Sequence, residues 1–320
     1  MTDVHLVLGY PNAELQWKIW SEEEETIDFR KDSFAANRCS SAFAASELKY
    51  FLGKADPDLS LQIREQRPSQ GLFIELKISE EESGGGFLLR PDGEGLMMIG
   101  HGRNGLINGA YEVIRRQGWR WLEPGQYGES APEKPHLNWP KEEIVFRPSF
   151  RYRGMDAFRT SNDSENHLKW LSRNRCNVCF RKAATGKLAD KLGMFSRQGG
   201  HLLQTMLQPN NLLPNGKSLW ETHPEWYGLP SDGKRRKETA IHCQLCLAHE
   251  SLFDYLGEKI LHILDAEFAD VDILDLWSFD TWGATCSCPF CVELGNGADQ
   301  TLYLLSQIRR RLDNNLRRQI

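Results

Sequence analysis

The sequence of residues 272–282 reads DILDLWSFDTW. The mostly apolar run at residues 272–279 predicts a short buried strand, of the kind that parallel sheets contain. Asp280 and Trp282 follow at its carboxyl end, which is where parallel-barrel enzymes place catalytic side chains. Asp280 is therefore the leading candidate for a catalytic carboxylate, although an Asp at a strand end can equally cap a turn.

The sequence around this strand alternates between strand and helix signals. From residue 146 onward we expect strands at 150–155, 176–180 and 272–279, a short helix at 187–192 before Met194-Phe195, and further helices at 165–173, 251–264 and 301–316. The last helix is expected to bury one face, made of Leu302, Leu305, Ile308, Leu312 and Leu316. This alternation predicts a parallel sheet with helical crossovers, counted as four strand–helix units.

Four units are half of a closed barrel, which has eight strands and typically about 250 residues. We therefore expect residues 146–320 to form an incomplete (β/α)8 TIM-type barrel, the first half of a truncated fold. Its last strand would carry unpaired backbone groups, and such an open edge favours self-association or aggregation. A long excursion at residues 199–247, rich in Trp, His, Pro and Asn, is typical of an active-site loop.

The first part of the chain, residues 1–145, predicts a small mixed α/β domain. Strands are expected at residues 4–8, 59–63, 72–78, 87–90 and 96–100, and a helix at 41–52. Glycines at 100, 102, 105 and 109 lead into a helix at 110–117, but their spacing fits neither the dinucleotide fingerprint nor the phosphate-binding loop. We interpret them as allowing close helix-to-sheet packing, and we expect no organic cofactor.

Composition and charge exclude several classes of function. The 39 basic residues are outnumbered by 44 acidic ones, which argues against a nucleic-acid-binding surface. No apolar run reaches the roughly 18 residues of a membrane helix, and residues 1–8 lack the pattern of a signal peptide. We therefore expect a cytoplasmic protein without membrane contact. Five of the eight cysteines crowd between residues 243 and 291, unlike a disulfide framework.

The cysteines Cys286, Cys288 and Cys291 have a spacing that lets three thiolates converge on one tetrahedral ion. A fourth ligand is needed, and the nearby candidates are His242, Cys243, Cys246 and His249. A structural zinc ion fits better than a catalytic one, because three thiolates leave the ion a poor Lewis acid. The alternative is a set of buried thiols without a metal.

Other side chains are candidates for substrate binding. Arg153 and Asp156 lie near the end of the first expected barrel strand, where they could hold substrate hydroxyls or form salt bridges at the rim. His201 follows Gly199-Gly200, which would let the backbone bring an imidazole into a cleft. A lone histidine is otherwise usually structural.

The aromatic residues around position 225 suggest a further part of the site. Trp226 and Trp282 offer flat apolar faces suited to sugar rings, although core packing is equally plausible in a chain with ten tryptophans. Glu225 lies between Pro224 and Trp226, and aromatic surroundings could raise its pKa toward the range of a general acid.

Several stretches together resemble one bacterial family. They are Gly105–Tyr111 with Gly118–Trp121, Arg147-Pro148, Arg153-Gly154, Trp170–Asn177, Gly199–His201, His223–Trp226, Gln244–Leu247, and Asp280 with the cysteine motif. The family is Domain of Unknown Function 4838, partly recognised as endo-β-N-acetylglucosaminidase-type glycoside hydrolases. Its N-terminal module is similar to those of α-glucuronidases and hexosaminidases.

The resemblance implies retaining-type hydrolysis of a glycan that contains N-acetylglucosamine, with paired carboxylates at the site. It implies Cys246 as the fourth metal ligand, and Asp280, His201, Arg153 and Asn177 as one side of the sugar site. Related hexosaminidases place an Asp-Glu pair after the fourth strand, whereas this chain has Asp280-Thr281. The acid/base glutamates are then expected on later strands, beyond residue 320.

Two other classes of function remain open from the sequence. One is a non-catalytic carbohydrate-binding or scaffold protein, whose open half-barrel a partner or a second copy stabilises. The other is an α-glucuronidase that acts on plant polysaccharide, since that class shares the N-terminal module.

Overall fold

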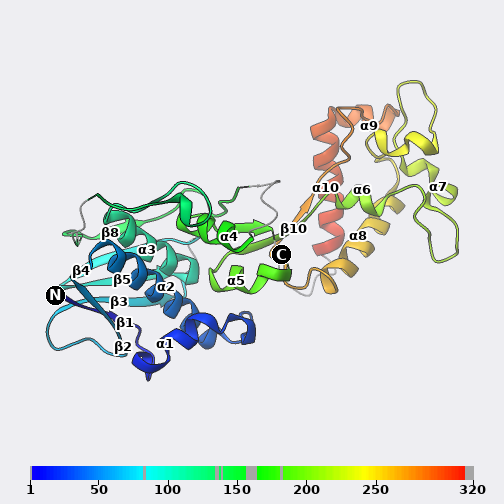
Figure 1. Cartoon of the computed structure of the whole chain (residues 1–320). Helices are drawn as coiled ribbons and strands as arrows, with labels where there is room; N and C mark the ends of the chain where they lie inside the picture. Colours follow the sequence, from blue (N-terminus) through cyan, green and yellow to red (C-terminus); the bar gives the residue numbers. More distant parts are fainter. Residues whose placement is uncertain are drawn as a thin grey trace. The chain divides into compact units, whose positions relative to one another are not determined.

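The computed structural model describes residues 2–81, 84–133, 137, 140–155, 164–180 and 183–313 (Figure 1). The chain forms two compact units, Met1–Ser196 and Arg197–Ile320. This division by compactness differs from the predicted domain boundary at residue 145, which marks where the barrel-type alternation begins in the sequence. The predicted domains 1–145 and 146–320 stay a prediction.

A mixed six-stranded sheet forms the centre of the first unit. Its strands, in spatial order, are β2 (Leu59–Arg64), β1 (Thr2–Val7), β3 (Leu72–Ser79), β5 (Gly95–His101), β4 (Phe87–Asp92) and β8 (Ile144–Phe146). The first four pair in parallel, whereas β4 runs antiparallel to both β5 and β8. The prediction of a mixed α/β chain is confirmed.

Three helices accompany this sheet: α1 (Ala13–Glu22), α2 (Ser33–Ala55) and α3 (Gly102–Arg116). Helix α2 begins at an Asp32 cap, whose side chain accepts a hydrogen bond from the Ala35 amide. The glycines before and within α3 permit the close packing that we predicted: a Cβ on Gly100 would lie 1.9 Å from the Leu106 nitrogen, and one on Gly105 would lie 2.2 Å from the Gly86 oxygen. Only glycine fits at either position.

The first unit is completed by short elements. They are β6 (Arg120–Trp121) and β7 (Glu129–Ser130), which form a two-stranded sheet, α4 (Ser164–Arg173), β9 (Val178–Phe180), α5 (Gly186–Lys191), and the 3-10 turns η1 (Glu24–Thr26), η2 (Gln126–Gly128) and η3 (Ala183–Thr185). The described residues 150–155 carry no strand, so the predicted first barrel strand is wrong in this structure. The Arg153 carbonyl instead accepts hydrogen bonds from the amides of Asn177 and Val178.

The second unit is built on one pair of parallel strands and two packed helices. Strands β10 (Phe195–Gly200) and β11 (Ile273–Leu276) pair from Arg197 opposite Ile273 to Gly200 opposite Leu276. The helices are α6 (Leu202–Met206), α7 (Leu219–Thr222), α8 (Glu250–Asp265), α9 (Pro289–Leu294) and α10 (Gly297–Asp313), with the 3-10 turns η4 (Pro224–Trp226) and η5 (Lys237–His242). Helices α8 and α10 pack together and supply much of the core.

The buried face of α10 differs from the predicted one. Leu304, Ile308 and Leu312 are buried, whereas Leu302 is 67% exposed and Leu316 lies outside the described residues. The buried face of the helix is thus rotated relative to the predicted one, since Leu304 belongs to the hydrophobic core of this unit and Leu302 does not. Glycine 257 in α8 allows the close approach of α10, since a Cβ there would lie 3.0 Å from the Arg311 side chain.

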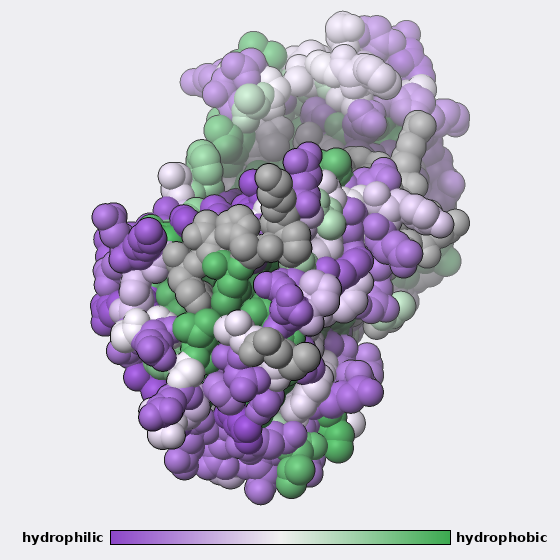
Figure 2. Space-filling model, turned by 60° about the vertical axis from the view of Figure 1, so that its left-hand side comes forward, coloured by the Kyte–Doolittle hydropathy of each residue, from purple (hydrophilic) through white to green (hydrophobic). Residues whose placement is uncertain are grey.

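The face of the molecule drawn in Figure 2 is mostly polar. Figure 2 shows a face on which hydrophilic residues surround smaller areas of apolar ones. Single exposed apolar side chains are normal on protein surfaces and carry no functional meaning by themselves. None of the described helices is long and apolar enough to cross a membrane.

A buried ion cluster joins four elements of the first unit. Arg173 lies 3.1 Å from a carboxylate oxygen of Glu47 and 3.1 Å from one of Glu129, and its side chain is 10% exposed. The Tyr111 hydroxyl donates to the same Glu47 oxygen at 2.8 Å. Burial by itself would lower the pKa of Arg173, but Tyr111 and Glu47 outweigh burial and raise it. The guanidinium is therefore a fixed positive charge between α2, α3, α4 and β7.

We predict that Arg173→Met destabilises the first unit by about 3–5 kcal/mol, because it leaves buried carboxylates without a partner. The control is Arg90→Met, which breaks an ion pair to Glu143 whose side chains are 50% and 46% exposed. That variant should cost at most about 1 kcal/mol. Urea unfolding followed by circular dichroism measures both. Equal losses in the two variants would contradict the structural role of the cluster.

Candidate functional site and metal centre

Two parallel strands end side by side in the second unit and set the position of the candidate site. His201 directly follows β10, and Asp280 follows β11 after three residues, 277–279, that belong to no helix or strand. Glycine is required at position 199, where β10 lies against β11, since a Cβ there would lie 2.0 Å from the Asp275 carbonyl oxygen. Gly199 and Gly200 have φ values of 121° and 77°, which turn the chain at the strand end as we expected.

A pocket of about 710 Å³ lies at these strand ends. It is lined by His201, Gln204, Ile241, His242, Asp280, Thr281 and Trp282. The structure thus brings His201 and Asp280 to one pocket, although their roles stay predictions. The His201 ring packs edge-on against Trp277, with ring centroids 5.0 Å apart. Ile241 and His242 come from the long excursion that was expected to form an active-site loop.

Trp282 is the unusual residue of this pocket. Its side chain is 98% exposed, and its backbone is left-handed, with φ at 51°. For a residue other than glycine this conformation costs roughly 1–2 kcal/mol. A large apolar side chain held in a strained position at a pocket is typical of a binding residue, since neither feature stabilises the fold.

Arg153 and Asn177 belong to the first unit, where their side chains bind backbone groups. Arg153 donates from Nε to the Arg175 carbonyl and from Nη1 to the carbonyls of Gly84 and Phe150. The buried Asn177 accepts the Arg153 amide and donates to Arg151. These contacts account for both residues structurally, and their sugar-binding role stays a prediction. Asp156 lies outside the described residues.

The structure changes the interpretation of Glu225 and Trp226. Burial tends to raise the pKa of Glu225, but the hydrogen bond from His223, a backbone hydrogen bond and electrostatic interactions with His223 and His249 together outweigh burial and lower the pKa. The prediction of a raised pKa is therefore wrong, because a histidine contacts this carboxylate at 3.0 Å. Trp226 is 2% exposed, and its ring stacks on His223 at 3.8 Å. Neighbouring rings pack against Trp226, so of these two tryptophans it is Trp282 that has an exposed ring.

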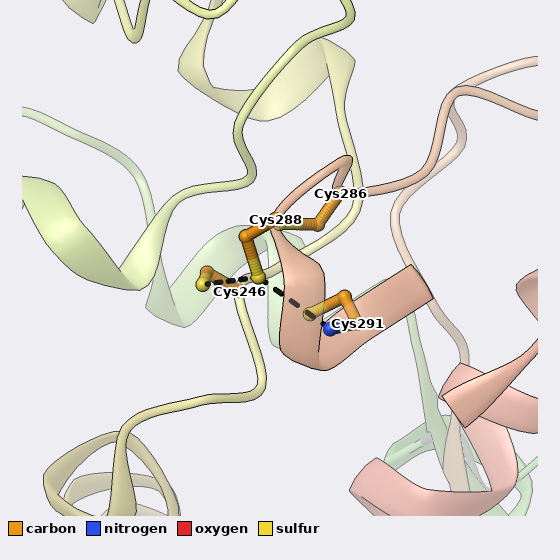
Figure 3. A group of neighbouring side chains, drawn as sticks. All are labelled: Cys246, Cys286, Cys288 and Cys291. Atoms are coloured by element: carbon orange, nitrogen blue, oxygen red, sulfur yellow. Dashed lines mark hydrogen bonds between the residues drawn. The ribbon is translucent and has the colours of Figure 1, made fainter. Parts of the chain in front are cut away.

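Four cysteine sulfurs converge in the second unit, as Figure 3 shows. The sulfurs of Cys246, Cys286, Cys288 and Cys291 all lie within 4.8 Å of one another. Cys286 and Cys288 lie on the approach to α9, Cys291 lies in its first turn, and Cys246 comes from the segment before α8. Three of the residues are buried, and Cys288 is partly buried. Among the described residues, Cys246 joins the other three cysteines, whereas Cys243 and the histidines do not, and the role of Cys246 as a metal ligand stays a prediction.

The donor set fits a metal ion. Four sulfurs at 2.3 Å from one tetrahedral ion lie about 3.8 Å apart, and Cys246 and Cys288 are already 3.6 Å apart. Backbone amides point at the sulfurs: Leu229 donates to Cys286 at 3.3 Å, and Leu247 donates to Cys291 at 3.2 Å. Such amides stabilise thiolates, the form in which sulfur binds metal.

Hydrogen bonds among three of the four thiols shift their pKa values when no ion is bound. Hydrogen bonds from Cys246 and Cys291 lower the pKa of Cys286. The hydrogen bond between Cys246 and Cys286 raises the pKa of Cys246 to about 11. The same contacts raise the pKa of Cys291. A metal ion must therefore displace protons from several thiols when it binds. Burial raises the pKa of the separate Cys243 to about 11, so that thiol is unreactive.

The sequence profile of the family described as "Domain of unknown function (DUF4838)" matches residues 124–306, more than half of the chain. The chain belongs to this family. The DUF4838 match includes every residue of the pocket and all four clustered cysteines. No curated protein sequence matches the chain.

Two solved structures resemble this DUF4838 chain in fold. One is a GH138 enzyme that targets pectin rhamnogalacturonan II, with 11% identity and a TM-score of 0.46, covering 98% of this chain and 42% of that enzyme. The other is a GH115 4-O-methyl-α-glucuronidase with specificity for decorated arabinogalactans, with 13% identity and a TM-score of 0.46, covering 98% of this chain and 40% of that enzyme. The chain thus spans about two fifths of each.

Several pocket residues had no signal in the sequence. Gln204, Ile241 and Thr281 were not predicted, and His242 was considered only as a metal ligand. His242 lines the pocket in this structure and is exposed. A pattern that could have suggested these positions is their location a few residues after Gly199-Gly200 or a few residues before the clustered cysteines.

We predict about one tightly bound metal ion per chain. Cys286→Ser and Cys291→Ser should each lose most of this metal, because a hydroxyl is a poor substitute for a buried thiolate. Cys243→Ser is the matched control, since Cys243 is buried nearby but does not belong to the group. Elemental analysis of protein purified without chelator measures the content. Metal far below one equivalent in the unmodified protein would exclude the site.

Proposed function

We propose that this chain forms one side of a glycoside hydrolase-type site, in which the pocket of the second unit receives a sugar ring. The observation that carries the proposal is the placement of His201, Asp280 and Trp282 on one pocket at the carboxyl ends of two parallel strands. Ligand and catalytic sites of parallel α/β folds collect at this edge. The incomplete (β/α)8 barrel predicted for residues 146–320 would be the scaffold of this site.

Each of the three side chains suits one part of a sugar. The exposed Trp282 ring offers an apolar face for the C–H side of a pyranose. The Asp280 carboxylate accepts hydrogen bonds from hydroxyls, or stabilises positive charge that develops at the anomeric carbon. The His201 imidazole can donate or accept a hydrogen bond.

Hydrolysis of a glycosidic bond uses two carboxylates. Of the pocket-lining residues within the described part of the chain, Asp280 alone has a carboxylate. We propose that the second carboxylate is supplied from outside these residues, as the family resemblance implies for later strands. We propose N-acetylglucosamine-containing glycans as the substrate class, on the basis of that same resemblance.

The single carboxylate favours a second candidate function. A pocket with one carboxylate, two imidazoles and an open tryptophan can bind a carbohydrate without cleaving it. The chain would then be a carbohydrate-binding protein, and the two functions differ only in turnover.

We propose zinc as the ion held by Cys246, Cys286, Cys288 and Cys291. Four sulfur ligands close the coordination shell and leave no position for substrate or water. The ion would therefore support the fold of the second unit, and the sugar chemistry would rest on the side chains of the pocket.

We predict that Trp282→Gly weakens binding of an N-acetylglucosamine oligosaccharide at least tenfold without loss of stability. Removing the stacking surface costs affinity, whereas glycine relieves the left-handed strain, so the unfolding free energy should stay within about 1 kcal/mol of the original or rise. Leu302→Ala is the control, because Leu302 is exposed and is not among the pocket-lining residues. Isothermal titration calorimetry and thermal unfolding give both quantities. Unchanged binding in Trp282→Gly would contradict the sugar pocket.

We predict that Asp280→Asn separates the two candidate functions. If the chain cleaves a glycan, this variant should lose at least about 100-fold in turnover, while affinity changes only a few-fold. Product release from a panel that includes N-acetylglucosamine and glucuronic acid glycans is followed by chromatography. Binding without turnover in the unmodified chain would favour the carbohydrate-binding function, and turnover that survives in Asp280→Asn would exclude Asp280 as catalytic.

A further inference from the structure

Gln244 connects the pocket to the cysteine cluster. Its side-chain amide nitrogen donates to the Phe279 carbonyl at 2.5 Å and to the Thr281 hydroxyl at 2.9 Å. Its side-chain oxygen accepts the Phe279 amide at 3.1 Å. Gln244 thus satisfies both backbone groups of Phe279, as a neighbouring strand would.

The bonds of Gln244 fix the loop that carries the pocket residues. Its backbone amide also donates to the Ala284 carbonyl at 3.0 Å. Within the loop, the Thr281 hydroxyl donates to the same Ala284 carbonyl, and the Ala284 amide donates to the Thr281 carbonyl. Asp280 and Trp282 lie between these anchored positions, and residues 280–285 form no helix or strand of their own. Their placement therefore depends on these few contacts.

The segments that line the pocket are also the segments that carry the metal ligands. Ile241 and His242 come shortly before Gln244, and Cys246 comes shortly after it. On the other segment, Asp280, Thr281 and Trp282 come shortly before Cys286. The Gln244 side chain bonds the first segment to the second, and it does so at a point between the sulfur cluster and the pocket.

We infer that Gln244 is a positioning residue, through which metal binding at the four cysteines sets the geometry and the ligand affinity of the pocket. The inference rests on the proposed sugar site and deepens it: the ion touches no sugar, yet the sugar binds more tightly when the ion is present. Linked binding of this kind typically changes affinity by about 5- to 150-fold, and the ligand must tighten the metal by the same factor.

The test compares Gln244→Met with Gln300→Met in the full chain. Methionine keeps the length of the side chain and removes its hydrogen bonds. Gln300 is the control, because it is a buried glutamine that, like the partly buried Gln244, donates to a backbone carbonyl near the cluster, in this case that of Cys291, and it is not among the pocket-lining residues. Both variants should retain about one zinc ion.

The first readout needs no sugar. Hydrogen–deuterium exchange of the zinc-loaded proteins should show at least about tenfold faster exchange over residues 279–285 in Gln244→Met, and unchanged exchange there in Gln300→Met. Removing zinc from the unmodified protein should produce the same local effect. Equal exchange of this loop in all the zinc-loaded proteins would overturn the inference, whether or not the pocket binds sugar.

The second readout is the linkage itself. In the unmodified protein and in Gln300→Met, an N-acetylglucosamine oligosaccharide should raise the affinity for zinc, and zinc should raise the affinity for the sugar by the same factor. In Gln244→Met the factor should fall to about one, with sugar affinity reduced at least tenfold. A factor that persists in Gln244→Met overturns the inference. A complete lack of sugar binding in the unmodified protein rejects the proposed function instead, and the exchange experiment then decides the inference alone.

Discussion

The second unit depends on the convergence of four sulfur atoms within 4.8 Å. Two segments meet there that have little regular structure: one runs from the 3-10 turn η5 to α8, and the other from β11 to α9. Segments of this kind form few hydrogen bonds between their own backbone groups. A strong local constraint therefore has to hold them in place, as a sheet or a long helix would elsewhere. The amides of Leu229 and Leu247, which point at the sulfurs, show that the backbone is already folded around the cluster.

The part of the fold that the sequence predicted well is the part governed by periodicity and by spacing. Apolar patterns in the sequence identified β1 to β5 of the first unit but not β6, β7 or β8, and the cysteine spacing identified three members of the cluster, because both signals are local. The resemblance supplied Cys246, which no local rule separates from Cys243. The sequence could not show which of the ten tryptophans are exposed. Trp226 and Trp282 both follow turn-forming residues, yet Trp226 is 2% exposed and Trp282 is 98% exposed. Burial is a property of the tertiary structure.

Arg153 and Asn177 illustrate a second limit of sequence reasoning. Arg153 was a substrate-binding candidate because it lies near the end of an expected strand, and the family resemblance implied Asn177. In the structure their donors bind carbonyls of Gly84 and of residues 150–151, in segments that have no strand neighbour to satisfy them. A backbone oxygen without a strand partner still needs a hydrogen bond, and here a side chain supplies it. Gln244 serves Phe279 in the same way, and no composition or periodicity signal marks such a residue.

Cys246 and Cys288 are 42 residues apart in the chain, and α8 and β11 lie between them. An ion held by both sulfurs closes this stretch into a loop, which removes conformational entropy from the unfolded chain. Within the closed loop, helix α8 and strand β11 search a much smaller volume for their packing partners, so contacts that are distant along the sequence become effectively local. The ion would thereby act on the speed of folding as well as on the folded state, since folding slows as contacts become less local.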